Sequence, residues 1–224
     1  MNPRVSAFRW VPPFAQGLVR DLRVRWALHE AGREYDELLI GPQEQSSKEY
    51  RRLQPFGQVP TYQGDELSLF ETGAIVLHIA ETCPQLLPTE ATARSRAKAW
   101  MFAALNSVEP PILFHNQLEM MQVDHANPIR QAVVGAVNTR LNDLAVWLGD
   151  RSYLEQQFSA GDLLMTTVLR ILRSTDLLGA HPTLQAYQHR CEQRVAFQRA
   201  LGEQLHTFQE HQPTQSGRRS ARAN

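Results

Sequence analysis

The stretch of sequence that most constrains the fold is QPFGQVPTYQGDELSLFETGAIVLHIAE, residues 54–81. Two short runs of strand-forming residues, VPTY and LSL, flank the turn sequence Gln-Gly-Asp-Glu at 63–66, and this order predicts a β-hairpin. A helix signal follows at 72–82, and Pro84 limits its end because the residue before a proline avoids helical angles. The stretch therefore predicts two paired strands followed at once by a helix.

The residues before this stretch predict a strand, a helix and a second strand. VSAFRW (5–10) and YDELLI (35–40) are typical of short strands. From Leu18 the spacing becomes helical, and Gly32 marks the end of that helix. The polar segment 44–53 predicts one irregular, solvated helix. Apolar residues of the helix that begins at Leu18 share one face: Leu22, Trp26, Ala27 and Ala31.

The composition changes after residue 83, and the pattern beyond PQLLPTE (84–90) is helical throughout. We therefore predict an N-terminal domain over 1–83, a linker over 84–90, an all-helical domain over 91–209, and a polar, disordered tail over 210–224. In one helix, apolar residues at three- and four-residue spacing predict a buried stripe: Val133, Val137, Leu141, Leu144 and Leu148. The expected helices cover 91–108, 112–124, 129–148, 162–174, 183–193 and 196–209, with breaks at Pro110-Pro111 and Asn127-Pro128.

Charge and cysteine content exclude several classes of function. Lys and Arg total 23 and Asp and Glu total 23, so the chain has no overall field for nucleic acid or an anionic membrane. The two cysteines, Cys83 and Cys191, form no C-x-x-C and no metal-ligand spacing, and we expect buried thiols in a reducing compartment. The arginine-containing start shows no signal peptide, and no apolar run would span a bilayer. We therefore expect a cytoplasmic protein.

Three motifs, PFGQVPTY (55–62), LFETGAIVLHI (69–79) and FSAGDLL (158–164), together with this order of elements, resemble the glutathione transferase family. Their order and separation carry the resemblance, which covers about residues 5–209. It implies a thioredoxin-like α/β N-terminal domain of β-α-β-β-β-α type with a mixed sheet, joined to an all-α C-terminal domain. It also implies a homodimer that uses glutathione as cosubstrate and needs no metal.

The resemblance implies that Pro60 follows a cis peptide bond, which turns the backbone of Val59 toward a peptide-like ligand, as an edge strand would. The alternative is a trans proline that begins an edge strand. Gln58, with Gln54, is a weaker candidate for binding the glycyl end of glutathione.

At the start of the next helix, the resemblance assigns Glu71 to the ammonium of the γ-glutamyl group. Thr72 can act as the N-cap, and free N–H groups at a helix start attract a carboxylate. The alternative is a simple cap with an acidic residue that suits the helix dipole. In the third motif, Ser159 and Asp162 predict a capping box with a structural role.

The residue that would activate glutathione is not evident. Lowering a thiol pKa from about 8.5 to about 6.5 takes roughly 2.7 kcal/mol, and a helix start supplies at most about 2. Members of the family usually place Tyr, Ser or Cys between the first strand and helix, but residues 7–34 contain no Ser, Thr, Cys or Tyr. We therefore predict catalysis by Arg20, or by the backbone amides of 17–18, with Trp10 or Gln16 assisting. The alternative is a solvated Arg20 opposite Asp21.

The remaining candidates concern the acceptor substrate. In the family this substrate lies between the domains, and the aromatic residues and methionines here suggest an apolar electrophile or peroxide; the alternative is that they are helix core. His115 and Glu119 lie one helical turn apart, but no further ligands accompany them, so we expect no metal site. The sequence predicts a glutathione transferase, and leaves open a glutathione-dependent disulfide or peroxide reductase or a non-catalytic binding module. The acceptor-site candidates are Phe14, Phe102 and Asn106, with Trp100, Phe114, Met120 and Met121.

Overall fold

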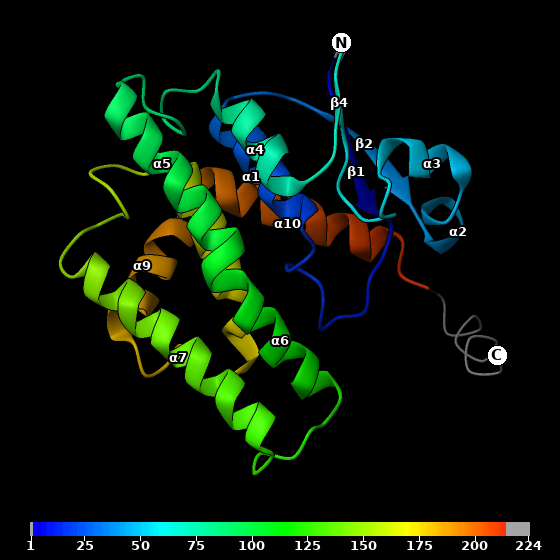
Figure 1. The fold of residues 1–224 in the computed structure, drawn as a ribbon. Coiled ribbons are helices and arrows are strands. Elements are labelled where there is room, and N and C mark those ends of the chain that lie inside the picture. The colour runs from blue at the N-terminus through cyan, green and yellow to red at the C-terminus, as the bar shows by residue number, and fades with distance from the viewer. Residues whose placement is uncertain (1, 214–224) are drawn as a thin grey trace.

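The structure, a computed structural model, describes residues 2–213 (Figure 1). Most of the predicted tail therefore lies outside the described residues. The N-terminal region contains β1 (Arg4–Phe8), α1 (Asp21–Glu30), β2 (Asp36–Ile40), α2 (Pro42–Gln45), α3 (Lys48–Leu53), β3 (Tyr62–Gln63), β4 (Ser68–Leu69) and α4 (Thr72–Ala80). The C-terminal region contains α5 (Ala91–Ala103), η1 (Ala104–Val108), α6 (Glu109–Met120), α7 (Pro128–Leu148), α8 (Ala160–Leu169), η2 (Arg170–Ser174), α9 (Pro182–Glu192) and α10 (Val195–Glu210).

The strands form a mixed sheet in the order β2-β1-β3-β4, which confirms the predicted sheet. β1 and β2 run parallel, from Arg4 opposite Asp36 to Phe8 opposite Ile40. β3 is antiparallel to both β1 and β4, so the predicted hairpin is present with shorter strands than expected. The segment 44–53 was expected to be one irregular helix, but two short helices, α2 and α3, occupy this part of the chain.

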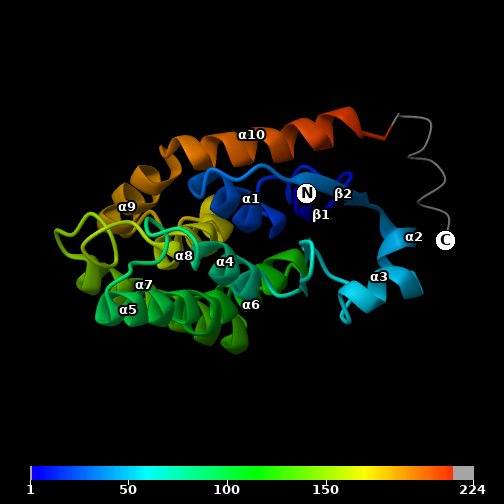
Figure 2. The ribbon, with the colours of Figure 1, turned by 90° about the horizontal axis from the view of Figure 1, so that it is seen from above.

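The elements are arranged in layers. Seen from above, α10 runs along one side, α1, α4 and α8 lie in the middle beside the sheet, and α5, α6 and α7 form the opposite side (Figure 2). Trp26 of α1 is fully buried, with ring centroids 4.8 Å from Phe197 of α10 and 5.7 Å from Phe158. One buried cluster contains residues of both regions, and the predicted domain bounds at 83 and 91 stay a prediction.

The break expected at Pro110-Pro111 is wrong. The chain passes from α5 into α6 through η1, a π-helical turn in which the Glu109 N–H donates to the Ala104 carbonyl. The prolines occupy the first turn of α6, where a missing N–H costs least. Such π turns often occur at functional sites, and this one directs Glu109 toward α1.

Two structural predictions for the helical region are confirmed. All five residues of the predicted stripe on α7 are buried. At the start of α8, Asp162 accepts bonds of 2.9 Å from the N–H groups of Ser159 and Leu154 and from the Tyr187 hydroxyl. Burial raises the pKa of Asp162 against the effect of these bonds. Among the described helices, none has the length and apolar character needed to cross a membrane.

Candidate functional site

The first part of the candidate site is the segment before β3. The bond between Val59 and Pro60 is cis, as predicted. Within residues 2–213, neither the N–H nor the C=O of Val59 forms a hydrogen bond, although Val59 is 8% exposed. The Val59 side chain packs in a small apolar cluster that also contacts Val19, just before α1. The end of the long loop 9–20 is therefore placed beside an unpaired stretch of backbone.

Buried hydroxyl groups form hydrogen bonds with the backbone on either side of Val59 and Pro60. The Ser6 hydroxyl, in β1, accepts the Thr61 N–H at 2.6 Å. The Tyr50 hydroxyl donates to the Gln58 carbonyl at 2.6 Å, so the Ser6 hydroxyl, 2.8 Å from Tyr50, is the donor between the two. Ser6 therefore has a structural role behind Val59. Gln58 has an exposed side chain near this segment, whereas Gln54 is buried and accepts the Phe56 N–H.

The second part of the site is the start of α4. The prediction that Thr72 is the N-cap is wrong, because Glu71 occupies that position without a side-chain cap and Thr72 is the first helical residue. Glu71 has φ 69°, which is uncommon for a residue with a side chain, and its carboxylate is exposed. A Cβ on Gly73 would lie 2.7 Å from Leu105 Cδ1, so the start of α4 packs closely on η1.

The loop between β1 and α1 forms the third part. The helix starts at Asp21, later than the predicted Leu18. The backbone N–H groups of Gly17 and Leu18 were candidates for thiolate binding, but they donate to Gln204 Oε1 and to the Ala15 carbonyl. The Gln16 side chain donates to the Val11 carbonyl at 3.1 Å, and Trp10 is half-buried after β1.

Arg20 is neither free nor opposite Asp21. Its guanidinium lies 2.9 Å from the carboxylate of Glu109, which also binds Arg23 at 2.8 Å. Asp21 instead forms a buried pair with Arg25 at 2.7 Å. The alternative of a solvated arginine opposite Asp21 is therefore wrong.

The group formed by Arg20, Glu109 and Arg23 carries more positive than negative charge. Burial alone would raise the pKa of the Glu109 carboxyl, but Arg23 and Arg20 outweigh burial and hold it below its ordinary value. A carboxylate shared between two guanidinium groups leaves one positive charge unbalanced. Because Arg20 has a side chain 36% exposed and Arg23 only 4%, a ligand would meet this charge at Arg20.

A cavity of about 420 Å³ lies between the loop, α6 and η2. Phe14 and Met120, which the sequence suggested for an acceptor site, line it together with Arg20, the predicted thiolate-stabilising residue, whereas Phe102 and Asn106 are exposed on α5 and η1 and do not. A larger hollow, of about 760 Å³, lies near residues 84–97 and 155–159 and contains none of the predicted site residues. The smaller cavity is lined by Phe14, Ala15, Leu18, Val19, Arg20, Arg23, Glu109, Leu113, Asn116, Glu119, Met120, Ile171 and Ser174.

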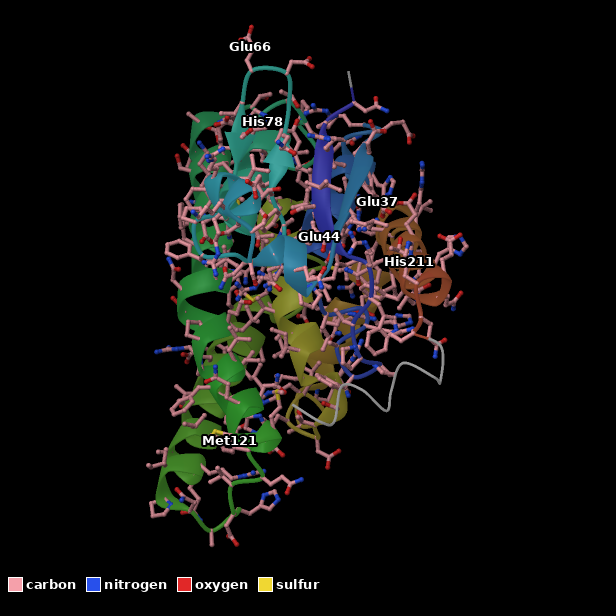
Figure 3. All side chains as sticks on the ribbon, turned by 90° about the vertical axis from the view of Figure 1, so that its right-hand side faces the viewer. Glu37, Glu44, Glu66, His78, Met121 and His211 are labelled. Atoms are coloured by element: carbon pink, nitrogen blue, oxygen red, sulfur yellow. The ribbon has the colours of Figure 1, made fainter. Side chains whose placement is uncertain are left out.

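Met121, one residue beyond α6, is exposed at the opposite end of the molecule from Glu66 in the β3–β4 turn (Figure 3). Near this end, Glu119 is paired with Arg130 and lies 3.3 Å from His115. No cluster of His, Cys, Asp or Glu that could hold a metal ion occurs within residues 2–213. Cys83 and Cys191 are buried free thiols, and burial raises the pKa of Cys191 to about 12.

The mixed sheet with its following helices and the helical region packed against it define a thioredoxin-like domain joined to a helical domain, the glutathione transferase fold. Residues 16–81 match the family model of the glutathione S-transferase N-terminal domain. The chain is 28% identical over 172 residues to the rice protein "Probable glutathione S-transferase GSTF2", covering 72% of this chain and 79% of that protein. It is 34% identical to Glutathione S-transferase F10 of Arabidopsis thaliana over 74 residues, which cover 31% of this chain and 34% of that protein.

Among solved structures, a glutathione transferase from Pseudomonas putida with one glutathione disulfide bound per subunit superposes with a TM-score of 0.77. It is 20% identical, and the match covers 89% of this chain and 90% of that chain. Residues 16–81 therefore carry a glutathione S-transferase N-terminal domain, and the chain as a whole has the glutathione transferase fold.

Proposed function

We propose that this protein is a glutathione transferase that conjugates the thiolate of glutathione to a small apolar electrophile. The observation that carries the proposal is the unpaired backbone of Val59 near an apolar cavity walled by the loop 14–20. An extended peptide can pair with such a backbone. The free N–H groups at the start of α4 suit the γ-glutamyl carboxylate, with Glu71 pairing its ammonium and Thr72 beside it. Gln58 is positioned for the glycyl end.

Arg20 is the proposed source of thiolate stabilisation. The loop contains no hydroxyl or thiol side chain, so a charge must supply what the start of a helix does not. The unbalanced positive charge shared by Arg20, Arg23 and Glu109 supports this role. Within the described residues, the N–H groups of Val19 and Arg20 donate to no other residue and can assist. Trp10 and Gln16 remain weaker candidates, since the Gln16 side chain is bonded to the loop itself.

A second candidate function is glutathione-dependent reduction of a disulfide. The lack of a cysteine in the loop does not exclude it, because a bound glutathione can carry the redox thiol itself, and the neighbour from Pseudomonas putida, which contains glutathione disulfide, favours it. In this reaction the thiolate of one glutathione attacks a mixed disulfide, a new S–S bond forms as the old S–S bond breaks, and the displaced thiolate takes up a proton and leaves as a thiol.

Turnover of chlorodinitrobenzene and of a small mixed disulfide, measured side by side with glutathione, separates these functions. Conjugation predicts aryl-glutathione at a rate well above the uncatalysed reaction and little disulfide cleavage. Disulfide cleavage without conjugation would support the reductase. Binding of glutathione without either turnover would leave a binding module and refute both enzymes.

We further propose a cytoplasmic homodimer with an isologous interface. The segment 43–52 and the start of α5 are the proposed contact surfaces, and Phe56, which is 63% exposed and in an edge-to-face contact with Phe70, lies close to the first in sequence. A solution-scattering mass close to that of one 25.5 kDa chain would contradict the dimer.

A further inference from the structure

The loop that lines the proposed acceptor cavity is fixed by side chains of the C-terminal region that do not themselves line the cavity. Arg173 of η2 donates to the carbonyls of Phe14 at 3.1 Å and Gln16 at 2.7 Å. Arg170, three residues earlier, donates through Nε to the Gly17 carbonyl at 3.0 Å. These bonds fix three carbonyl groups within residues 14–17 of a loop that has no strand or long helix of its own.

A third side chain fixes the end of the loop. Gln204 of α10 is fully buried, and its Oε1 accepts the Gly17 N–H at 3.1 Å. Its Nε2 donates to the Val19 carbonyl at 3.2 Å and to Asp21 Oδ1 at 2.8 Å. One amide group therefore ties both sides of the turn that leads into α1, on either side of Arg20.

The conformation of Gly17 depends on these side-chain contacts. Gly17 has φ 74°, and a Cβ at this position would lie 3.1 Å from Arg173 Nη1 and 3.3 Å from Arg170 Nη2. Arg170 is itself held by Glu192 at 2.9 Å and lies over the ring of Phe197. The two guanidinium groups thus occupy the space that a side chain at residue 17 would take, and α9 and α10 hold one of them in place.

We infer that Arg173, Arg170 and Gln204 are positioning residues, which hold the loop so that Arg20 and Val19 face bound glutathione. None of the three lines the cavity, so each acts through the loop backbone. In a loop without a catalytic hydroxyl, the direction of one guanidinium and of the neighbouring amides decides how well a thiolate is stabilised. A fixed loop geometry therefore matters more here than in a loop that carries a catalytic hydroxyl. This inference rests on the proposed transferase function.

The test compares Arg173→Ala and Gln204→Leu with Arg199→Ala as a matched control. Like Arg173, Arg199 is exposed, and like Gln204, it joins α10 to the N-terminal region. Its partner there is Glu34, and it does not touch the loop. The thiolate absorbance of bound glutathione is titrated against pH, glutathione affinity is measured by calorimetry, and kcat is measured with chlorodinitrobenzene. Arg173→Ala removes an exposed side chain, so it stays informative if Gln204→Leu folds poorly.

Both loop variants should raise the pKa of the bound thiol by about 1 unit, since nearby charge typically shifts a pKa by about 1–3 units. They should lower kcat at least about tenfold, because a displacement on the order of 1 Å can cost about 100-fold. Affinity for glutathione with a protonated thiol should change less than twofold, Arg173→Lys should recover part of kcat, and Arg199→Ala should match the parent protein.

The two possible failures are distinguishable. If the parent protein lowers the thiol pKa and the loop variants titrate like Arg199→Ala, the positioning inference is wrong and the transferase proposal stands. If glutathione bound to the parent protein titrates like free glutathione, the transferase proposal fails, and the inference that depends on it fails too.

Discussion

Replacement of Glu109 by alanine should destabilise the protein far more than replacement of Arg20 by glutamine. Glu109 is 3% exposed, and its Oε1 lies 2.8 Å from Arg23 and 2.9 Å from Arg20. Without the carboxylate, the Arg23 charge stays buried and unpaired, which costs about 3–5 kcal/mol. Arg20→Gln keeps the buried pair and removes a partly exposed one, which is worth at most about 1 kcal/mol.

The assay is thermal unfolding followed by circular dichroism, supported by urea unfolding. For a chain of this size, 1 kcal/mol shifts Tm by about 2–4 °C, so Glu109→Ala should lower Tm by roughly 10 °C and Arg20→Gln by only a few degrees. Equal Tm values for the two variants would refute the conclusion that Glu109 mainly neutralises a buried Arg23.

The Glu109 carboxylate should also affect how the free energy of unfolding falls at acid pH. Its pKa in the folded protein lies below the ordinary 4.5, so the folded state binds this proton less readily than the unfolded chain. The stabilisation is therefore complete above pH 4.5 and is lost as the pH falls through the folded pKa. Glu109→Gln should flatten this part of the curve of unfolding free energy against pH. An unchanged curve would contradict the pairing.

Two further predictions concern catalysis and folding. Arg20→Gln should raise the pKa of bound glutathione by about 1–3 units with nearly unchanged affinity for the protonated thiol, and coinciding thiolate titrations would exclude Arg20 as the stabilising group. Asp162→Ala should lower the unfolding free energy by at least about 3 kcal/mol, because it leaves four buried donors without their acceptor at about 1–3 kcal/mol each. A variant that melts like the parent protein but has no activity would show that the role of Asp162 is not structural.

Local patterns predicted much of the fold because its elements depend on neighbours in sequence. The hairpin, the stripe on α7 and the capping box at Ser159 and Asp162 each follow from residues within a few turns. Pro110-Pro111 misled the prediction because a π turn lets two prolines begin a helix that continues from the one before.

The candidate site was predicted less well because its groups meet from distant parts of the chain. Arg20 and Glu109 are 89 residues apart, and Gly17 and Gln204 are 187 residues apart. The sequence carried one usable signal for the first pair, an acidic residue directly before two prolines at a helix start. For Gln204 we find no such signal, because a lone glutamine in an amphipathic helix normally faces solvent.

The proposed function depends on glutathione binding at the unpaired backbone of Val59 and the start of α4. Calorimetric titration of glutathione into the parent protein, Glu71→Ala and the control Glu66→Ala tests it most directly; Glu66 is an exposed acid in the β3–β4 turn of the same region (Figure 3). We expect at least about a tenfold larger Kd for Glu71→Ala, because a charge-assisted bond is worth about 1.5–3 kcal/mol, and an unchanged Kd for Glu66→Ala. Equal Kd values for all three proteins would contradict the claim.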